Sequence, residues 1–262
     1  MSEEKTQQAK TETQPKFPSE IIDLPSGGKL YGKDSPLYDG KIEIKYMTAR
    51  EEDILTSQNL IKKGVVLDKL LESLIISKGV KCEDLILGDK NAVMIAARIL
   101  AYGPEYTVKV LNPNTNEQIE HTFDLSACPF KQLDKSVDLS VNSFECTLPS
   151  SKLKIKYKIL TGGEEKQIEA ELDSLKKLNQ QYAPELTTRL RHVITEVDGN
   201  DDKATIRAFV SNMLSRDSFY LRKQVSKLAP DIELQQEIDI EGETVKVDIP
   251  VTVNFFWPDT SE

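Results

Sequence analysis

Between Thr48 and Tyr102, hydrophobic residues recur every three or four positions, the spacing of one face of an α-helix. Thr48 and Glu51 have the T-x-x-E spacing of a capping box, and Gly64 is placed to end the helix that they begin. Two more apolar faces follow, within residues 66–75 and 92–100. Short amphipathic helices depend on packing for stability, so this stretch predicts a small helical cluster.

Alternation of hydrophobic and polar residues predicts strands on both sides of the cluster. Residues 41–48 alternate Ile42, Ile44 and Tyr46 with charged residues, as a half-buried strand does. After the helices, residues 106–110 and 119–123 alternate around a turn rich in Asn and Pro. That pattern is typical of a β-hairpin.

The second half of the chain contains the same kinds of pattern. Two strands are expected around a turn at 149–151, and helical spacing follows in four stretches. The chain closes with a second expected hairpin, whose turn is at 241–243. The four helical stretches are residues 162–180, 186–194, 203–214 and 218–228.

Two matches suggest an internal repeat. Lys41–Tyr46 (KIEIKY) resembles Lys152–Tyr157 (KLKIKY) at an offset of 111 residues, and Asp89-Lys90 matches Asp202-Lys203 at an offset of 113. The predicted fold class is therefore α+β, with two similar modules, each a strand, a small helical cluster and a β-hairpin. Chance similarity between amphipathic strands is the alternative.

This organisation predicts three parts. Residues 1–16 are polar and charged and lack aromatic residues, so they are expected to be a disordered leader. Residues 17–130 would hold an extended arm and the first module. Residues 131–262 would hold the second module with the terminal hairpin, joined through a connector at 126–140.

The arm at 17–40 is rich in proline and glycine and is not expected to be one regular element. Its hydrophobic residues could anchor it on this protein's own surface or on a neighbour in an assembly. At the other end, Phe255–Trp257 are three consecutive aromatics, which cannot all face one side of a strand. They could plug the core or form a docking edge. The candidate protein-binding residues are Ile21, Ile22, Leu24, Leu30, Tyr31, Phe255, Phe256 and Trp257.

A helix junction at Ser215–Arg222 combines two arginines with two aromatics and is a weaker candidate for a partner contact. The 262 residues carry a net charge of -9, which disfavours nucleic acid as a partner. Neither a transmembrane run nor a secretory signal is recognisable. The three cysteines are odd in number and widely spaced, which argues against a disulfide framework and favours a reducing compartment.

No catalytic chemistry is recognisable in the sequence. His121 and His192 are isolated from each other, and Cys128 lacks the second cysteine of a zinc knuckle. The nucleotide-binding and nucleophile motifs are missing. The chain is therefore expected to be no enzyme, with no cofactor and no metal.

Three strings carry a family resemblance: FPSEIIDLPSGGKLY at 17–31, the stretch 41–75 around TAREEDILTSQNLIKKG, and GDKNAVMIAARILAYG at 88–103. They resemble baseplate hub proteins of T-even-like contractile-tailed bacteriophages. The closing pattern, SRDSFYLRK and then FFWP, is similar to related tail proteins. Some relatives hold paired cysteines in the terminal hairpin; residues 232–250 here contain none, so a zinc clasp is not expected.

The resemblance implies a structural hub subunit or hub-assembly protein that docks with other baseplate or tail proteins, or with copies of itself. Neither nucleic acid nor membrane is an expected partner. The alternative is an assembly chaperone for a tail protein such as the tape measure, absent from the finished virion. The expected location is the tail baseplate of the virion, or an assembly intermediate in the host cytoplasm.

Overall fold

A computed structural model describes residues 18–112, 115, 117–133, 139–178, 183–240, 242–251 and 253–256. The expected leader at 1–16, part of the connector and Trp257 lie outside these residues. Helices and small antiparallel sheets alternate along the described chain, which confirms the predicted α+β class.

The first half pairs β1 (Ser19–Asp23) with β2 (Lys41–Lys45) in an antiparallel sheet, followed by the helical cluster. Ile42 and Ile44 of β2 face the core and are almost completely buried. Ile75, directly after α3, forms a bridge with Ile44 and so lies beside β2. The helical elements are α1 (Ala49–Thr56), α2 (Gln58–Lys62), α3 (Val66–Leu74), the 3-10 turn η1 (Cys82–Asp84) and α4 (Leu87–Tyr102).

One predicted helix is divided in the structure, and one strand is present that the sequence did not predict. The helix expected to run from Thr48 to Gly64 is divided, because Ser57 is extended (ψ 104°) between α1 and α2. Strand β1 was not predicted, since the arm's prolines and glycines obscured it. Residues 19–23 nevertheless pair with β2 along their whole length, from Ser19 with Lys45 to Asp23 with Lys41.

The second half contains a three-stranded antiparallel sheet, ordered β5-β6-β7. Its strands are β5 (Phe144–Thr147), β6 (Lys154–Tyr157) and β7 (Ile194–Val197), and its helices are α5 (Gly162–Leu178), α6 (Glu185–Val193), α7 (Lys203–Ser211) and α8 (Ser215–Leu228). Strand β7 was not predicted, because it begins at the residue after α6 and continues that helix's hydrophobic pattern. Helix α8 begins three residues earlier than predicted, so the expected junction at Ser215–Arg222 lies within it.

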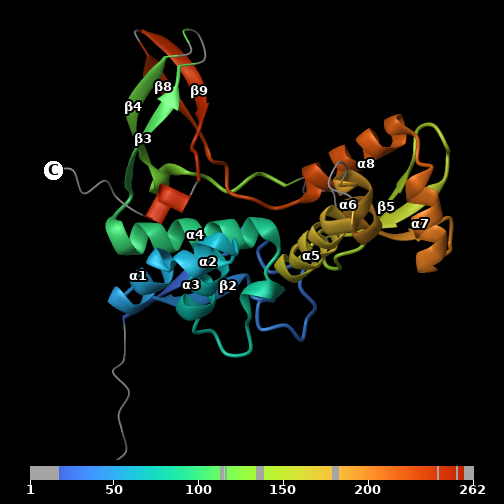
Figure 1. The fold of residues 1–262 in the computed structure, drawn as a ribbon, viewed down its shortest axis with the longest axis horizontal. Coiled ribbons are helices and arrows are strands. Elements are labelled where there is room, and N and C mark those ends of the chain that lie inside the picture. The colour runs from blue at the N-terminus through green and yellow to red at the C-terminus, as the bar shows by residue number, and fades with distance from the viewer. Residues whose placement is uncertain are drawn as a thin grey trace, which may run out of the picture.

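The hairpins of the two halves lie side by side. One is β3 (Glu105–Leu111) with β4 (Gln118–Asp124), and the other is β8 (Gln235–Ile240) with β9 (Glu243–Asp248). Figure 1 shows them projecting together above α4, while α5–α8 lie to one side. Gln236 Nε2 donates to the carbonyl of Asp124 at 2.7 Å, which ties the hairpins at their base. The end of the chain thus returns to the elements of its first half.

The strand-to-helix step of both halves contains the same cap. In the first, Glu51 accepts hydrogen bonds from the backbone N–H (3.0 Å) and hydroxyl (2.6 Å) of Thr48. In the second, Glu164 accepts from the backbone N–H of Thr161 at 3.0 Å. Each glutamate also pairs with a lysine: Glu51 with Lys45, the last residue of β2, and Glu164 with Lys158, the residue directly after β6.

These matching contacts align the two halves at a sequence offset of 113 residues, for the strand as well as for the helix. KIEIKYMTAREE at 41–52 then corresponds to KIKYKILTGGEE at 154–165, and the buried Ile42 and Ile44 correspond to the buried Ile155 and Tyr157. The offset of 111 for the strand is therefore wrong by two residues. Such a slip keeps the same face inward, because side chains on a strand alternate with a period of two.

The proposed match between Asp89 and Asp202 is also wrong. Asp202 caps α7 from an exposed position and accepts from Thr205 N. The residue that resembles Asp89 is Asp217: each is the third residue of a helix, is buried, and binds the loop between the first two strands of its half. Both helices precede a hairpin. These parallels support two similar modules, which stays a proposal.

Glu51 is expected to contribute strongly to stability. Its side chain is completely buried, and Lys45 Nζ and Ser73 Oγ also bind its carboxylate, at 2.7 and 2.6 Å. Glu51→Ala would leave these donors without their acceptor and should lower the free energy of unfolding by about 3 kcal/mol in denaturant titrations. Asp53→Ala, at an exposed position of the same helix, is the control and should change it by less than about 0.5 kcal/mol. Equal effects would contradict this role of Glu51.

The same carboxylate predicts an acid-sensitive fold. Burial alone would raise the pKa of Glu51, but hydrogen bonds from Lys45, Ser73 and Thr48 lower it from 4.5 to about 2. The stabilisation is thus complete above the pKa of the unfolded chain and is lost as pH falls from 4.5 towards 2. Glu51→Gln should flatten the pH dependence of the unfolding free energy in that window; an unchanged slope would assign it to other carboxylates.

Candidate protein interface

The arm at 17–40 is folded onto its own protein. Leu24, Leu30 and Tyr31 are buried, with 3%, 5% and 8% of their surface exposed, and Ile22 is half-buried. Three of the expected docking side chains of the arm therefore belong to the core. Of the five arm residues, Ile21 alone is well exposed, at 62%.

Asp89 fastens the arm to the helical cluster. Its carboxylate accepts from Ser26 N at 2.9 Å, from Ser26 Oγ at 2.6 Å and from the Tyr31 hydroxyl at 2.6 Å. The Tyr31 oxygen in turn accepts from the backbone N–H of Ile86 at 3.0 Å. The buried carboxylate is thus fully engaged, and the arm crosses the start of α4 at a defined place.

Burial raises the pKa of Asp89, although the hydrogen bonds from Ser26 and Tyr31 oppose that shift. Burial and the neighbouring Asp89 also raise the pKa of Tyr31, which keeps its hydroxyl protonated as a donor. The position of Asp89 in the first turn of α4 would by itself indicate only a favourable interaction with the helix dipole. The contact with Ser26 was missed because 63 residues separate the two.

Two of the three terminal aromatics, Phe255 and Phe256, are also buried. Phe255 and Phe256 lie in a 3-10 turn, η3 (Val253–Phe256), and expose 0% and 1% of their surface. The Phe255 ring meets Tyr106 edge-on with centroids 5.0 Å apart, and Arg98 Nε donates to the Phe255 carbonyl at 2.9 Å. The expectation that consecutive aromatics must point to opposite faces holds for a strand. It does not apply here, because residues 253–256 form a 3-10 turn and not a strand. Trp257 lies outside the described residues.

Strand β1 has an open edge. Hydrogen bonds from Leu24 N to Gly40 O and from Tyr46 N to Pro18 O show that the even-numbered residues of this segment bond to β2. In an antiparallel pair the bonded residues alternate, so the N–H and C=O groups of Ser19, Ile21 and Asp23 face the other way. Among the residues that the structure describes, β1 pairs with β2 alone, so this side of β1 is an open edge of the sheet.

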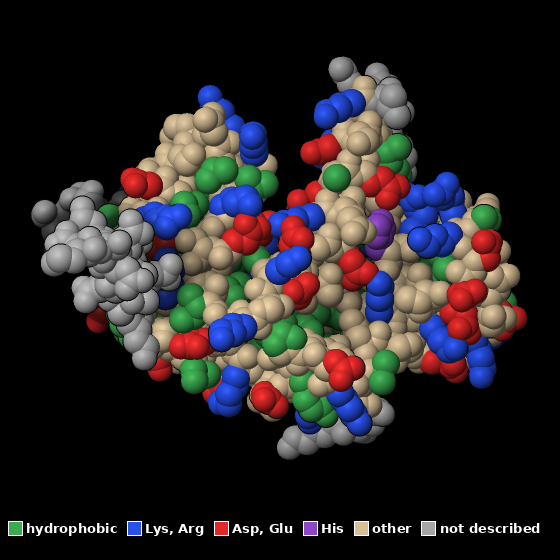
Figure 2. All heavy atoms as spheres, turned by 90° about the horizontal axis from the view of Figure 1, so that it is seen from below, with side chains coloured by type: hydrophobic (Ala, Val, Ile, Leu, Met, Phe, Trp, Pro, Cys, Tyr) green, Lys and Arg blue, Asp and Glu red, His purple; other side chains and the backbone are tan. Residues whose placement is uncertain are grey.

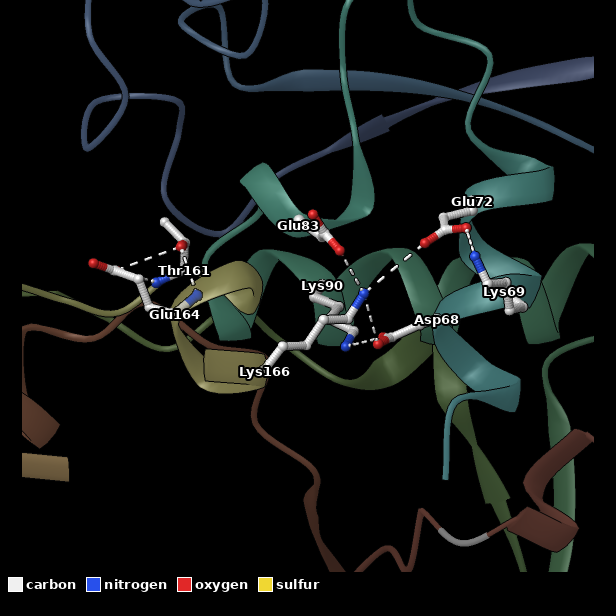
Figure 3. Close-up of polar contacts among 8 residues, drawn as sticks. All are labelled: Asp68, Lys69, Glu72, Glu83, Lys90, Thr161, Glu164 and Lys166. Carbon is white, nitrogen blue, oxygen red and sulfur yellow. Dashed lines mark hydrogen bonds and ion pairs between the residues drawn. The ribbon is translucent and has the colours of Figure 1, made fainter. Parts of the chain in front are cut away.

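The two halves meet at an ion network centred on Lys166 of α5 (Figure 3). Its Nζ lies 2.9 Å from Glu83 and 3.1 Å from Asp68, with Glu72 at 3.9 Å, and Lys90 also pairs with Asp68. Burial would lower the pKa of Lys166, but the hydrogen bonds that its ammonium group donates to Glu83 and Asp68 raise it, so the amine stays charged. Glu72 also pairs with Lys69, so the network contains three positive and three negative side chains. This balance of charge within the protein favours a structural role for the cluster.

Backbone contacts support the same junction. Gly162 N donates to Leu85 O at 2.7 Å. The backbone at Pro230 passes close to Gly88 of α4. A Cβ at position 88 would lie 1.8 Å from the carbonyl oxygen of Pro230, so the close approach requires glycine. Asn91 Nδ2 donates to Asp231 Oδ1 at 3.1 Å. The sequence held no signal for these contacts, because their partners lie roughly 80 to 140 residues apart.

The described part of the chain offers no grouping of three His, Cys, Asp or Glu side chains that could hold a metal ion. Among its helices, none is both long and apolar enough to cross a bilayer. Figure 2 shows charged side chains of both signs interspersed over one face, with hydrophobic side chains in small separate groups. That face resembles an ordinary solvated surface.

Asp89→Ala should release the arm. Ser26 N and the Tyr31 hydroxyl would lose their acceptor, and unsatisfied buried donors cost about 1–3 kcal/mol. Limited proteolysis should cleave residues 24–40 faster in this variant than in the wild type. Asp34→Ala, exposed in the same segment, is the control. Equal cleavage rates in the two variants would contradict an anchoring role for Asp89.

No curated protein and no solved structure matches the chain. The family model described as T4 bacteriophage base plate protein matches residues 17–257, which is nearly the whole chain and includes both halves and the returning hairpin. The chain therefore belongs to the T4 bacteriophage base plate protein family.

Proposed function

We propose that this chain is a structural subunit of the baseplate hub and acts by docking to other tail proteins, without catalysis. The family match over residues 17–257 carries the baseplate role. The hub assignment rests on the resemblance of residues 17–130 to hub proteins. The virion tail is the corresponding location.

The open edge of β1 is the docking element proposed for the arm. Ile21 is exposed beside outward-facing backbone groups of Ser19, Ile21 and Asp23. An extended segment of a partner could add a strand here, with hydrogen bonds to the backbone and an apolar contact to Ile21. Leu24, Leu30, Tyr31, Phe255 and Phe256 belong to the core, and their burial leaves them no surface for a partner.

Mass spectrometry of purified phage particles tests the role as a whole. A structural subunit is present at a fixed ratio to other baseplate proteins. An assembly chaperone, for example for the tape measure, is abundant in infected cells and missing from the particles. Absence from the particles would overturn the structural proposal in favour of the chaperone.

Ile21→Lys should reduce incorporation into particles, because a lysine on an edge strand opposes addition of another strand. The melting temperature should stay within a few degrees, since the side chain is 62% exposed. Tyr38→Lys, at a 42% exposed position of the same arm, is the matched control and should be incorporated normally. Normal incorporation of Ile21→Lys would exclude the edge as a docking element.

A pair of proline variants separates backbone docking from side-chain docking. Ile21→Pro removes an N–H group that faces outward, so the sheet should survive while strand addition is blocked. Ile22→Pro removes an N–H group that bonds to β2 and should destabilise the protein. If Ile21→Pro is incorporated and Ile21→Lys is not, the partner contacts the side chain and not the strand edge.

A further inference from the structure

Helix α8 carries all of its positive charges on its solvent face. Arg216, Arg222, Lys223 and Lys227 are exposed, and within the described residues none of them is in an ion pair. The helix has a single acidic residue, Asp217, which is 1% exposed and points into the protein. On a chain of net charge -9, this helix presents a locally positive surface.

Phe219 lies at the centre of that surface. It is 62% exposed, and helical spacing places Arg216, Arg222 and Lys223 three or four residues from it on the same face. The Arg222 guanidinium carbon lies 5.9 Å from the centroid of the Phe219 ring, within the range of a cation–π contact. Arginine and large aromatic residues are the types enriched in protein–protein interfaces.

The helix is held firmly from its other side. Asp217 accepts backbone N–H groups of Ser150 and Ser151, at 2.7 and 2.9 Å, and hydrogen bonds keep its pKa low despite burial. Leu221 and Leu228 bury the opposite face, with 0% and 8% of their surface exposed. A surface held in this way is preorganised, which lowers the entropic cost of binding.

We propose that the exposed face of α8 docks an acidic surface of another protein subunit, one that presents carboxylates around an apolar hollow for the Phe219 ring. Charge complementarity carries the choice of partner. A nucleic acid fits less well, because a polyanion approaching this chain meets a net charge of -9, and the basic face of α8 is short. The proposal rests on the docking role proposed above and is independent of the edge of β1.

Photocrosslinking of the full chain in infected cells tests it. Phe219 is replaced by photoreactive benzoylphenylalanine, and crosslinked peptides are identified by mass spectrometry. The control carries the same probe at Leu186 of α6, which is 43% exposed. The proposal expects a crosslink from position 219, and not from 186, to a segment of another tail protein that is rich in Asp and Glu.

Charge variants complete the test. Arg222→Glu with Lys223→Glu should lower the crosslink yield at position 219 about tenfold, as a loss of about 1.4 kcal/mol in binding would. Arg222→Lys with Lys223→Arg should preserve it. An unchanged melting temperature in both double variants excludes misfolding as the cause, since neither residue has an ion-pair partner to lose in the described structure.

Several outcomes would overturn the proposal: no crosslink above the Leu186 control, a crosslink to nucleic acid, a crosslink to a second copy of this chain, or a yield insensitive to charge reversal. Failure of the docking role as such is a different result. In that case the protein would be missing from particles and from assembly intermediates, whereas failure of this inference alone would leave it incorporated without a contact at Phe219.

Discussion

Two buried carboxylates hold the loops on which the rest of this structure depends. Asp89 and Asp217 each occupy the third position of a helix and accept backbone N–H groups from the loop between the first two strands of their half. A buried carboxylate is costly unless its oxygens are hydrogen-bonded, so each loop is confined to a position that satisfies it. Asp89 thereby brings the arm over the core, and Asp217 seats the helix that presents Phe219.

A second pair of carboxylates couples strand to helix. Glu51 and Glu164 each close a cap at the start of a helix and bind a lysine at, or directly after, the end of the preceding strand. The cap made by Glu51 or Glu164 and the loop contact made by Asp89 or Asp217 each occur once in each half. The cap comes first along the chain in both halves. This agreement at two separate contacts supports the proposal of two similar modules more strongly than the resemblance of two amphipathic strands does.

The structure separates candidate residues that are buried in the core from residues that are exposed and accessible to a partner. Most hydrophobic residues of the arm and both described terminal phenylalanines fill the core, and Arg98 ties the carbonyl of Phe255 to α4. What remains outside is the edge of β1 in one half and the solvent face of α8 in the other. The Lys166 network joins the half that contains β1 to the half that contains α8.

The sequence by itself determined the elements whose cause is local. The cap from Thr48 to Glu51 spans three residues, and helical or alternating spacing needs only a short window, so the α+β class, the helical cluster and both hairpins were predictable. The tertiary structure decided what depends on distant partners. Asp89 meets Ser26 across 63 residues, Lys166 meets Glu83 across 83, and Phe255 meets Arg98 across 157. A hydrophobic side chain such as Tyr31 or Phe255 is expected to be buried, but its hydrophobicity does not show whether its own protein or a neighbouring protein buries it. Only the folded chain, which brings those distant segments together, decides that these side chains are buried and that Ile21 and Phe219 are not.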